Sequence, residues 1–262
     1  MTVTFTLGDD GVAELIVESP PVNAFSIGDL EALRTHLRGV ESAPDVRVVL
    51  LRGEGRGFCG GGDVKEVQSL PAFEGILGQA RGSLEASLAV AECAVPVVGA
   101  IHEFCIGVGV LIAGTCDVLV ASEGTRFVLA EADNGATSGV VQALGLLPEK
   151  RVRSAMFTCE PFFAEELLAH GSVYRVMPAA DLLDEARRIA TVIAAKRPRV
   201  IRGLKQSMNA TTGVGTLRQR YRAELSHTFE LNMLGDAADA RASFLDGRRS
   251  SYLDDGNAPA RT

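Results

Sequence analysis

Residues 53–63 read GEGRGFCGGGD and place six glycines within eleven positions. The stretch follows an apolar run at Arg47–Leu51, which predicts a short buried strand, and it precedes a helix that we expect to begin at Val64. Glycines at such a junction let the backbone approach a ligand closely, and the exposed N–H groups can bind an anion or a developing negative charge. The stretch lacks the Gly-Lys-Ser/Thr ending of a phosphate loop and the register of a dinucleotide-binding GxGxxG motif. Taken alone, it is more typical of a tight turn between a strand and a helix.

A second glycine-rich stretch, CIGVGV at residues 105–110, follows an expected strand at Val97–Ile101 and begins a helix. N–H groups at the start of a helix lie where the helix dipole favours negative charge. The alternative is that Gly107 and Gly109 only allow the helix to pack closely on the strand.

The remaining chain alternates between strand-like and helical patterns up to about residue 195 and is helical beyond that point. Ser26, followed three residues later by Asp29, predicts the start of a helix. We therefore expect an α/β core at residues 1–195 and a helical region at residues 196–262, with a break at Thr212–Gly215. The other expected elements are the strands Val12–Val17, Val118–Ala121 and Val173–Met177 and the helices Ala164–His170 and Ala180–Lys196.

Composition excludes several classes of protein. The chain has 262 residues, of which 47% are hydrophobic and 23% charged, so a folded domain with a substantial core is expected rather than disorder. The net charge of −7 argues against a nucleic-acid-binding protein. Residues 196–262 hold 12 basic and 7 acidic side chains, so a basic tail follows an acidic body. Such a tail suits an anionic ligand or partner, although composition alone favours a solvated helical surface.

The cysteines predict free thiols in a reducing cytoplasm, because their number is odd and no CxxC or zinc-ligand spacing occurs among Cys59, Cys93, Cys105, Cys116 and Cys159. No metal site is expected. Met1–Thr6 alternates like a strand rather than a signal peptide. The most apolar run, Phe104–Cys116, is about half as long as a membrane span requires, so no membrane association is expected.

Further short segments extend the pattern of the two loops over nearly the whole chain: Pro21–Ala24, Phe58–Glu66, Pro96–Val98, Gly107–Gly109, Cys116–Asp117, Ala121–Ser122, Phe127–Glu131, Ala242–Phe244 and Arg248–Arg249. In this order they resemble the enoyl-CoA hydratase/isomerase, or crotonase, superfamily. The resemblance implies an α/β fold of the ClpP/crotonase type, a spiral of ββα units with a C-terminal helical region that builds a homotrimer, or a hexamer as a dimer of trimers.

The resemblance also implies a site for an acyl-CoA substrate, with coenzyme A part of the substrate and no cofactor bound permanently. The backbone N–H groups of Gly62 and Val108 would hold the thioester oxygen as it becomes an enolate. Hydratases of the family hold a water between two glutamates; Glu131 stands at one of these positions and Leu111 at the other. Glu131 would act as acid and base, with its pKa raised by an apolar pocket. The expected substrate-binding residues are Ala24, Gly60, Gly61, Gly62, Asp63, Val64, Phe104, Gly107 and Val108.

Some positions remain open at this point. Asp133 is a second possible acid if the segment is extended, whereas Asp133–Gly135 can equally form a turn. His102 and Glu103 form either a pair at the edge of the pocket or a structural hydrogen bond. Basic residues that the resemblance places near the CoA phosphates are Lys65, Arg248 and Arg249.

A single glutamate is compatible with hydrolytic carbon–carbon cleavage of a cyclic β-dicarbonyl acyl-CoA or with a 3-enoyl to 2-enoyl isomerisation. Glu54–Phe58, Glu92–Pro96 and Phe229–Asn232 resemble the actinobacterial crotonases that open the last steroid rings, which favours the hydrolytic reaction in steroid or lipid breakdown. An atypical hydratase, a non-catalytic acyl-CoA-binding protein and a structural subunit are the alternatives.

Overall fold

The larger of two sheets carries the fold. This computed structural model describes residues 3–71, 73–212 and 214–248. The six-stranded sheet has the order β1-β2-β3-β4-β6-β9, in which only β1 runs antiparallel to its neighbour. The strands are β1 (Val3–Leu7), β2 (Val12–Val17), β3 (Val48–Gly53), β4 (Val97–Ile101), β6 (Val118–Ser122) and β9 (Arg175–Met177).

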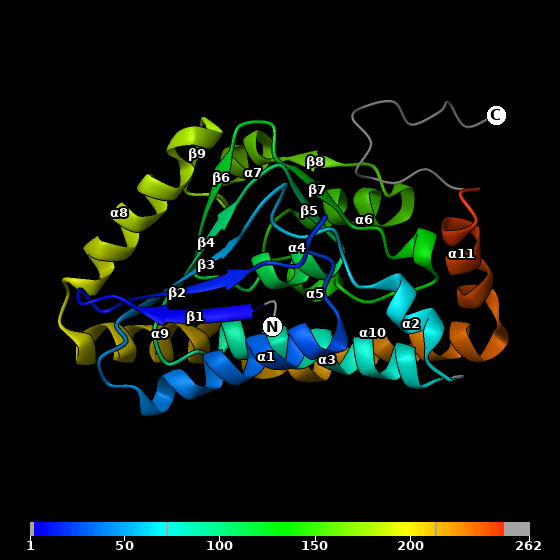
Figure 1. Cartoon of the computed structure of the whole chain (residues 1–262), viewed down its shortest axis with the longest axis horizontal. Coiled ribbons are helices and arrows are strands. Elements are labelled where there is room, and N and C mark those ends of the chain that lie inside the picture. The colour runs from blue at the N-terminus through cyan, green and yellow to red at the C-terminus, as the bar shows by residue number, and fades with distance from the viewer. Residues whose placement is uncertain (1–2, 72, 213, 249–262) are drawn as a thin grey trace.

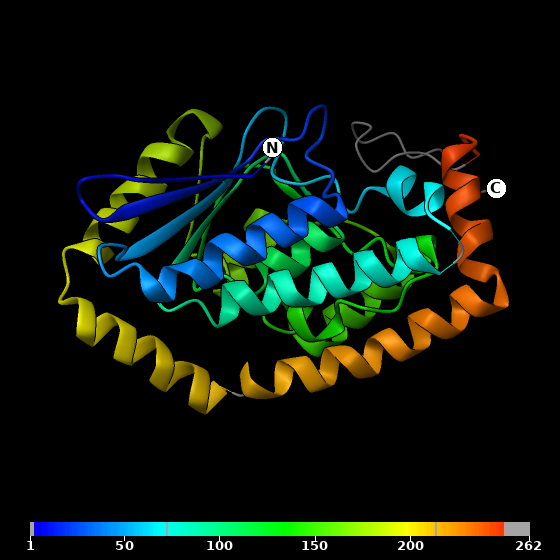
Figure 2. The ribbon, with the colours of Figure 1, turned by 60° about the horizontal axis from the view of Figure 1, so that its bottom comes forward.

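Helices cover both faces of this sheet, which explains why β3 and β4 are nearly continuous apolar runs. On one face, α1 (Ile27–Gly39) packs beside the long helix α3 (Glu74–Ala91) (Figure 2). On the other face, α8 (Leu182–Ala194) buries Leu182, Ala186 and Ile189 against side chains from β3, β4 and β6 (Figure 1). The sheet therefore lies at the centre of a layered core.

A three-stranded sheet, in the order β5-β7-β8, lies beside the larger one. Its strands are β5 (Phe104–Ile106), β7 (Arg126–Val128) and β8 (Phe162–Phe163). Short helices connect and flank these strands: α2 (Val64–Ser69), α4 (Val108–Ala113), α5 (Val140–Ala143), α6 (Glu149–Thr158) and α7 (Ala164–His170). Three 3₁₀ helices, η1 (Val40–Ser42), η2 (Ala132–Asn134) and η3 (Ala179–Asp181), complete the core.

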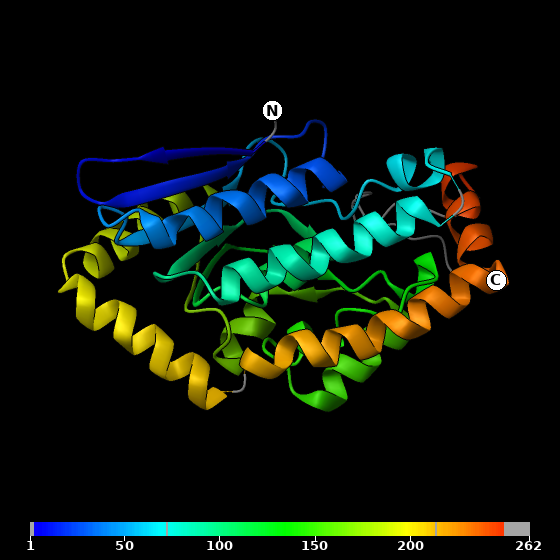
Figure 3. The ribbon, with the colours of Figure 1, turned by 90° about the horizontal axis from the view of Figure 1, so that it is seen from below.

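The described part of the chain ends in three helices that wrap back along the core: α9 (Pro198–Thr212), α10 (Val214–Leu234) and α11 (Asp236–Leu245) (Figure 3). Leu217, Tyr221 and Leu225 of α10 form one buried cluster with Ala80, Leu84 and Leu88 of α3. The ammonium group of Lys205 on α9 is buried and donates to Asp117 Oδ2 at 2.6 Å and to the carbonyls of Val90 and Val95. The helical region is thus packed onto its own core.

Many of the predicted elements are confirmed. Ser26 and Asp29 form a capping box at the start of α1, and Asp63 caps α2 at Val64. Helix α9 ends at Thr212 and α10 begins at Val214, and the break predicted at Thr212–Gly215 includes residue 213, which lies outside the described residues. The strand predicted at Val173–Met177 begins only at Arg175, and the break at Gly235, where α11 begins, was not predicted. All five cysteines are free. Within the described ranges, no helix combines the length and apolar character required to cross a bilayer.

Candidate active site

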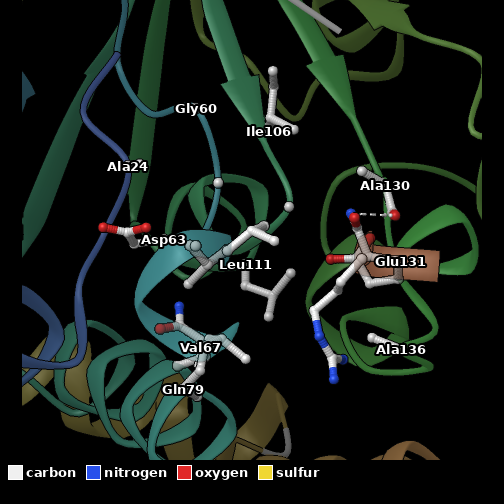
Figure 4. Close-up of a pocket in the computed structure, with 18 of the residues that line it drawn as sticks. Ala24, Gly60, Asp63, Val67, Gln79, Ile106, Leu111, Ala130, Glu131 and Ala136 are labelled. Carbon is white, nitrogen blue, oxygen red and sulfur yellow. Dashed lines mark hydrogen bonds between the residues drawn. The ribbon is translucent and has the colours of Figure 1, made fainter. Parts of the chain in front are cut away.

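A cavity of about 500 Å³ opens where the two glycine loops meet α2, α3 and the C-terminal helices. Figure 4 shows Gly60 and Asp63 on one wall and Glu131 on another, with Gln79 and Val67 contributed by the helices. Glu131, Leu111, Gly62 and Val108, the residues to which the sequence analysis assigns the chemistry, all line this one cavity.

Backbone pairing joins the two glycine loops next to the residues that line the cavity. The N–H of Cys59 donates to the Phe104 carbonyl at 3.2 Å, and the N–H of Ile106 donates to the Cys59 carbonyl at 2.9 Å. A Cβ atom added to Gly109 would lie only 2.7 Å from Cys59 Cβ, so this close approach requires glycine. The two interpretations of the loops, that their glycines allow close packing and that their N–H groups face a ligand, are therefore compatible.

The N–H groups of Gly62 and Val108 are left without a partner among the described residues. Residues next to Gly62 are fixed by Phe25, which donates to Gly61 O at 2.8 Å and accepts from Asp63 N at 2.9 Å. Val108 is the first residue of α4, where N–H groups have no intrahelical acceptor. Two N–H donors of this kind in one cavity fit the geometry of an oxyanion hole.

Asn23 holds the first loop in place from outside the cavity. Its side-chain amide donates to the carbonyls of Glu54 and Gly57 at 2.7 and 2.8 Å, and its Oδ1 accepts from Ser19 N at 2.7 Å. Asn23 is buried and has a φ of 53°, a left-handed conformation that asparagine adopts more readily than most residues. This asparagine therefore fixes the path of the chain before Gly60–Gly62.

Glu131 lies just after β7, immediately before η2, and only 7% of it is exposed. Its Oε2 atom has no hydrogen-bond partner in the described chain. Burial, with a smaller contribution from the nearby carboxylate of Glu224, raises the pKa of Glu131 to about 8. A Cβ atom on Gly107 would lie 3.6 Å from Glu131 Oε1, which places the carboxyl group beside the second loop. Such a group can exchange protons near neutral pH.

Leu111 supplies an apolar wall close to Glu131. Both residues adjoin Gly139: a Cβ atom added there would lie 2.8 Å from Leu111 Cδ1 and 3.8 Å from Glu131 Oε1. Leu111 can neither donate nor accept a proton. Asp63, the other acid that lines the cavity, accepts hydrogen bonds from Lys65 N and Glu66 N as the cap of α2.

Most of the other predicted binding residues line the cavity: Ala24, Gly60, Gly61, Asp63, Val64, Lys65 and Gly107. Phe104 does not, and this prediction is wrong. Its ring packs against the backbone of Gly57, where an added Cβ atom would lie 2.5 Å from Phe104 Cε1, and the next strand residue that lines the cavity is Ile106.

Asp133 is also absent from the cavity wall, because residues 132–134 form the 3₁₀ helix η2 and are not extended. The Nε2 atom of His102 is hydrogen-bonded to Gly55 O at 3.0 Å, which supports the structural interpretation of that residue. Arg248 does not line the cavity and forms an ion pair with Asp246, and Arg249 lies outside the described residues.

The sequence did not reveal several polar residues of the site, because distant helices bring them in. From α3 comes Gln79, whose Nε2 donates to Phe25 O at 3.4 Å and whose Oε1 is buried without a partner among the described residues. From α10 comes Tyr221, which is buried near Ser138. Burial raises the pKa of the Tyr221 hydroxyl above its usual range. Arg241 and Phe244 of α11 complete the wall, so the site is not confined to residues 1–195.

Helix α10 also positions the segment between Glu131 and α5. The Glu224 carboxylate accepts from Gly139 N at 2.8 Å and from Val141 N at 2.9 Å, and Thr228 Oγ1 accepts from Thr137 N at 2.9 Å. Burial raises the pKa of Glu224. These bonds hold the cavity wall that faces Leu111.

Comparison with known proteins agrees with this geometry. Two relatives named (7aS)-7a-methyl-1,5-dioxo-2,3,5,6,7,7a-hexahydro-1H-indene-carboxyl-CoA hydrolase are similar to the chain. The protein from Rhodococcus jostii is 39% identical, over 94% of this chain and 95% of its own length. The protein from Mycobacterium tuberculosis is 38% identical, over 94% of this chain and 99% of its own length.

A solved structure of an enoyl-CoA hydratase from Mycobacterium avium subsp. paratuberculosis superposes with a TM-score of 0.81 at 26% identity, covering 97% of this chain and 99% of that one. Residues 8–254 match the enoyl-CoA hydratase/isomerase family. The fold, the paired glycine loops and these similarities lead to one conclusion: the chain belongs to the enoyl-CoA hydratase/isomerase family of acyl-CoA enzymes, with the crotonase fold.

Proposed function

We propose that the protein hydrolyses a ring carbon–carbon bond in a cyclic ketone that is carried as a CoA thioester, in the breakdown of steroids or related lipids. One observation carries this proposal: the cavity offers a single unpartnered carboxyl group, that of Glu131, beside an apolar Leu111 and two free N–H groups. Hydration across a double bond with two carboxylates is not available to such a site.

The two relatives at 38 and 39% identity support the same substrate class, because their name describes a bicyclic diketone that bears a carboxyl-CoA group. Water can attack the carbonyl carbon of a ketone in such a ring. When the adjacent ring bond breaks, its electron pair can delocalise onto the thioester oxygen if the two groups are conjugated.

The proposed reaction begins with the thioester oxygen between the N–H groups of Gly62 and Val108. Ionised Glu131 takes a proton from water while the water oxygen bonds to the ring carbonyl carbon. The ring bond then breaks, the carbonyl becomes a carboxylic acid, and the electron pair moves onto the thioester oxygen, where the two N–H groups stabilise it. Protonated Glu131 returns its proton to the carbon that was released. One water is consumed and Glu131 is regenerated.

In this proposal, coenzyme A takes part only as a portion of the substrate. Its binding residues would be those of the first loop and its neighbours that line the cavity: Ala24, Gly60, Gly61, Gly62, Asp63, Val64, Lys65, Gly107 and Val108. The raised pKa of Glu131 suits it to both proton steps.

Turnover across a small panel tests the proposal. The panel contains the bicyclic dioxo-indene carboxyl-CoA, crotonyl-CoA and 3-hexenoyl-CoA. We expect rapid turnover of the first, with one atom of ¹⁸O from labelled water in the new carboxylate. Conversion of 3-hexenoyl-CoA alone would instead identify an isomerase, and rapid hydration of crotonyl-CoA a hydratase. Binding without turnover of any of the three would identify an acyl-CoA-binding protein.

We further propose a cytoplasmic homotrimer, or a hexamer of two trimers, for the intact protein. The exposed face of α9 supports a contact between copies, because Val200, Leu204 and Met208 repeat at helical spacing and are each more than half exposed. Sedimentation velocity of the purified protein gives the mass, and a monomer would contradict this assignment.

A further inference from the structure

The side chain of Arg241 is the cation that α11 contributes to the cavity wall. It is only 9% exposed. Its Nε atom donates to a neutral partner, Gln68 Oε1, at 3.1 Å. No carboxylate of the described residues forms an ion pair with it, and burial lowers the pKa of its guanidinium group.

A cation held this way has lost much of its hydration without gaining a counter-charge from the protein, which is energetically unfavourable. The guanidinium group retains N–H donors beyond the one used for Gln68, and its planar fork matches a carboxylate in a bidentate arrangement. The wall is therefore suited to an anionic group of a ligand.

Neighbouring contacts place helix α11 beside the turn that follows Glu131. Helix α11 packs against η2, the turn that begins directly after Glu131, and a Cβ atom on Gly135 would lie 2.3 Å from Ala237 Cα. Arg241 lies about one helical turn beyond Ala237. Asn134 and Ala136, on either side of Gly135, line the cavity together with Arg241.

We propose that Arg241 binds a carboxylate on the acyl group, namely the one that ring hydrolysis creates, and so makes the site specific for acyl chains that end in an acid. This inference rests on the proposed function, because ring hydrolysis is the step that creates the carboxylate. A neutral ring ketone becomes an anion in that reaction, and the unpaired cation of α11 stabilises the charge that appears.

Matched ligands test this recognition by direct binding. Isothermal titration would compare adipoyl-CoA with hexanoyl-CoA, glutaryl-CoA with pentanoyl-CoA, and CoA alone, for the wild-type protein, R241M and R248M. Arg248 is a suitable control because it is exposed, lies just after the same helix and does not line the cavity.

We expect the wild-type protein and R248M to bind adipoyl-CoA and glutaryl-CoA at least about tenfold more tightly than the matched neutral ligands. A charge-assisted hydrogen bond contributes enough binding free energy for a difference of this size. R241M should lose this preference and bind hexanoyl-CoA and CoA as the wild-type protein does. The dissociation constant of the ring-opened product should also rise about tenfold in R241M.

Two results would overturn the inference. One is a wild-type protein with no preference for the acid-ended ligands or for the ring-opened product. The other is an R241M variant that weakens CoA and both members of each pair equally, which would assign Arg241 to the CoA phosphates or to folding. Failure of the proposed function is distinguishable, because the bicyclic substrate would then not turn over while the preference for acid-ended acyl chains persisted.

Discussion

At the scale of single residues, Glu131 carries the chemistry that we propose. Replacing it by Gln keeps the size of the side chain and removes its ability to accept a proton. We expect E131Q to lower kcat by about 10²-fold or more, while the dissociation constant of a non-reacting CoA ester stays unchanged. Wild-type kcat/KM should rise with pH, reach half of its maximum near pH 8, where half of the Glu131 carboxyl groups are ionised, and level off at higher pH. An E131Q variant that retained most of its activity would remove Glu131 from the mechanism.

The same raised pKa predicts a dependence of stability on pH. A carboxyl group that ionises near 4.5 in the unfolded chain and near 8 in the folded chain stabilises the fold fully only below pH 4.5. Its contribution is lost as the pH rises to about 8. E131Q does not ionise, so its melting temperature relative to the wild-type protein should increase between pH 5 and pH 9. Calorimetry at these two values checks this, and a constant difference would show that Glu131 has an ordinary pKa.

Because Leu111 is apolar, we predict that the enzyme hydrates crotonyl-CoA slowly. Without a second carboxyl group to hold the water, hydration of crotonyl-CoA should be about 10²-fold slower than ring opening, since one acid–base group contributes at least that factor. Absorbance of the enoyl thioester follows this reaction directly. Comparable rates for the two substrates would mean that another group holds the water.

Residues of the site differ in how far the sequence could reveal them. Glu131, Gly62, Val108 and Leu111 were predicted, because the family motifs lie in short local segments. Gln79, Tyr221 and Arg241 were not, because each occurs singly on a helix whose approach to the cavity depends on tertiary packing. Phe104 was wrongly assigned: Phe104 and Ile106 belong to one buried cluster on β5, but the Phe104 ring fills the space left by Gly57, and only Ile106, at the end of the strand, lines the cavity.

At the scale of elements, the first glycine loop depends on a side chain outside it. Replacing Asn23 by Ala removes the three hydrogen bonds of that side chain and leaves an alanine with φ above zero. We expect a loss of about 2–4 kcal/mol in the free energy of unfolding. Urea unfolding measures this loss. Asn23→Asp keeps the acceptor and should fall between the wild-type protein and N23A, whereas equal stability of all three would show that the loop holds its own shape.

Local chemistry determined the elements that were predicted correctly. The capping box of Ser26 and Asp29 and the apolar strand Val97–Ile101 are decided within a few residues. The sequence around Asp133 was compatible with an extended segment or a turn. The structure shows the turn, in which Asn134 N and Ala136 N both donate to Glu131 O. The break at Gly235, with φ of 96°, depends on where α11 must pack against η2.

At the scale of the whole molecule, the basic tail neutralises the acidic core of its own chain. Lys205 pairs with Asp117, and Arg218 pairs with Glu85. The uneven charge seen in the sequence therefore reflects in part an internal interface.

We expect Lys205→Met to destabilise the protein by about 3 kcal/mol, because Asp117 and the carbonyls of Val90 and Val95 then lose the buried ammonium group that donates to them. The exposed Arg199 of the same helix provides the control, since R199M should leave the melting temperature nearly unchanged. Thermal unfolding of the two variants makes the comparison. Equal melting temperatures would mean that apolar contacts alone hold the tail in place.

The helices α10 and α11 supply cavity residues from a part of the chain that contains neither glycine loop. If Arg241 recognises the acyl group as we propose, chemistry and choice of acyl group are encoded by separate stretches of the sequence. Exchange of residues 214–248 between related enzymes would alter which acyl chains are accepted while the enolate-stabilising loops stay intact. An ancestral acyl-CoA enzyme could have acquired new substrates by varying its last helices, without rebuilding its catalytic centre.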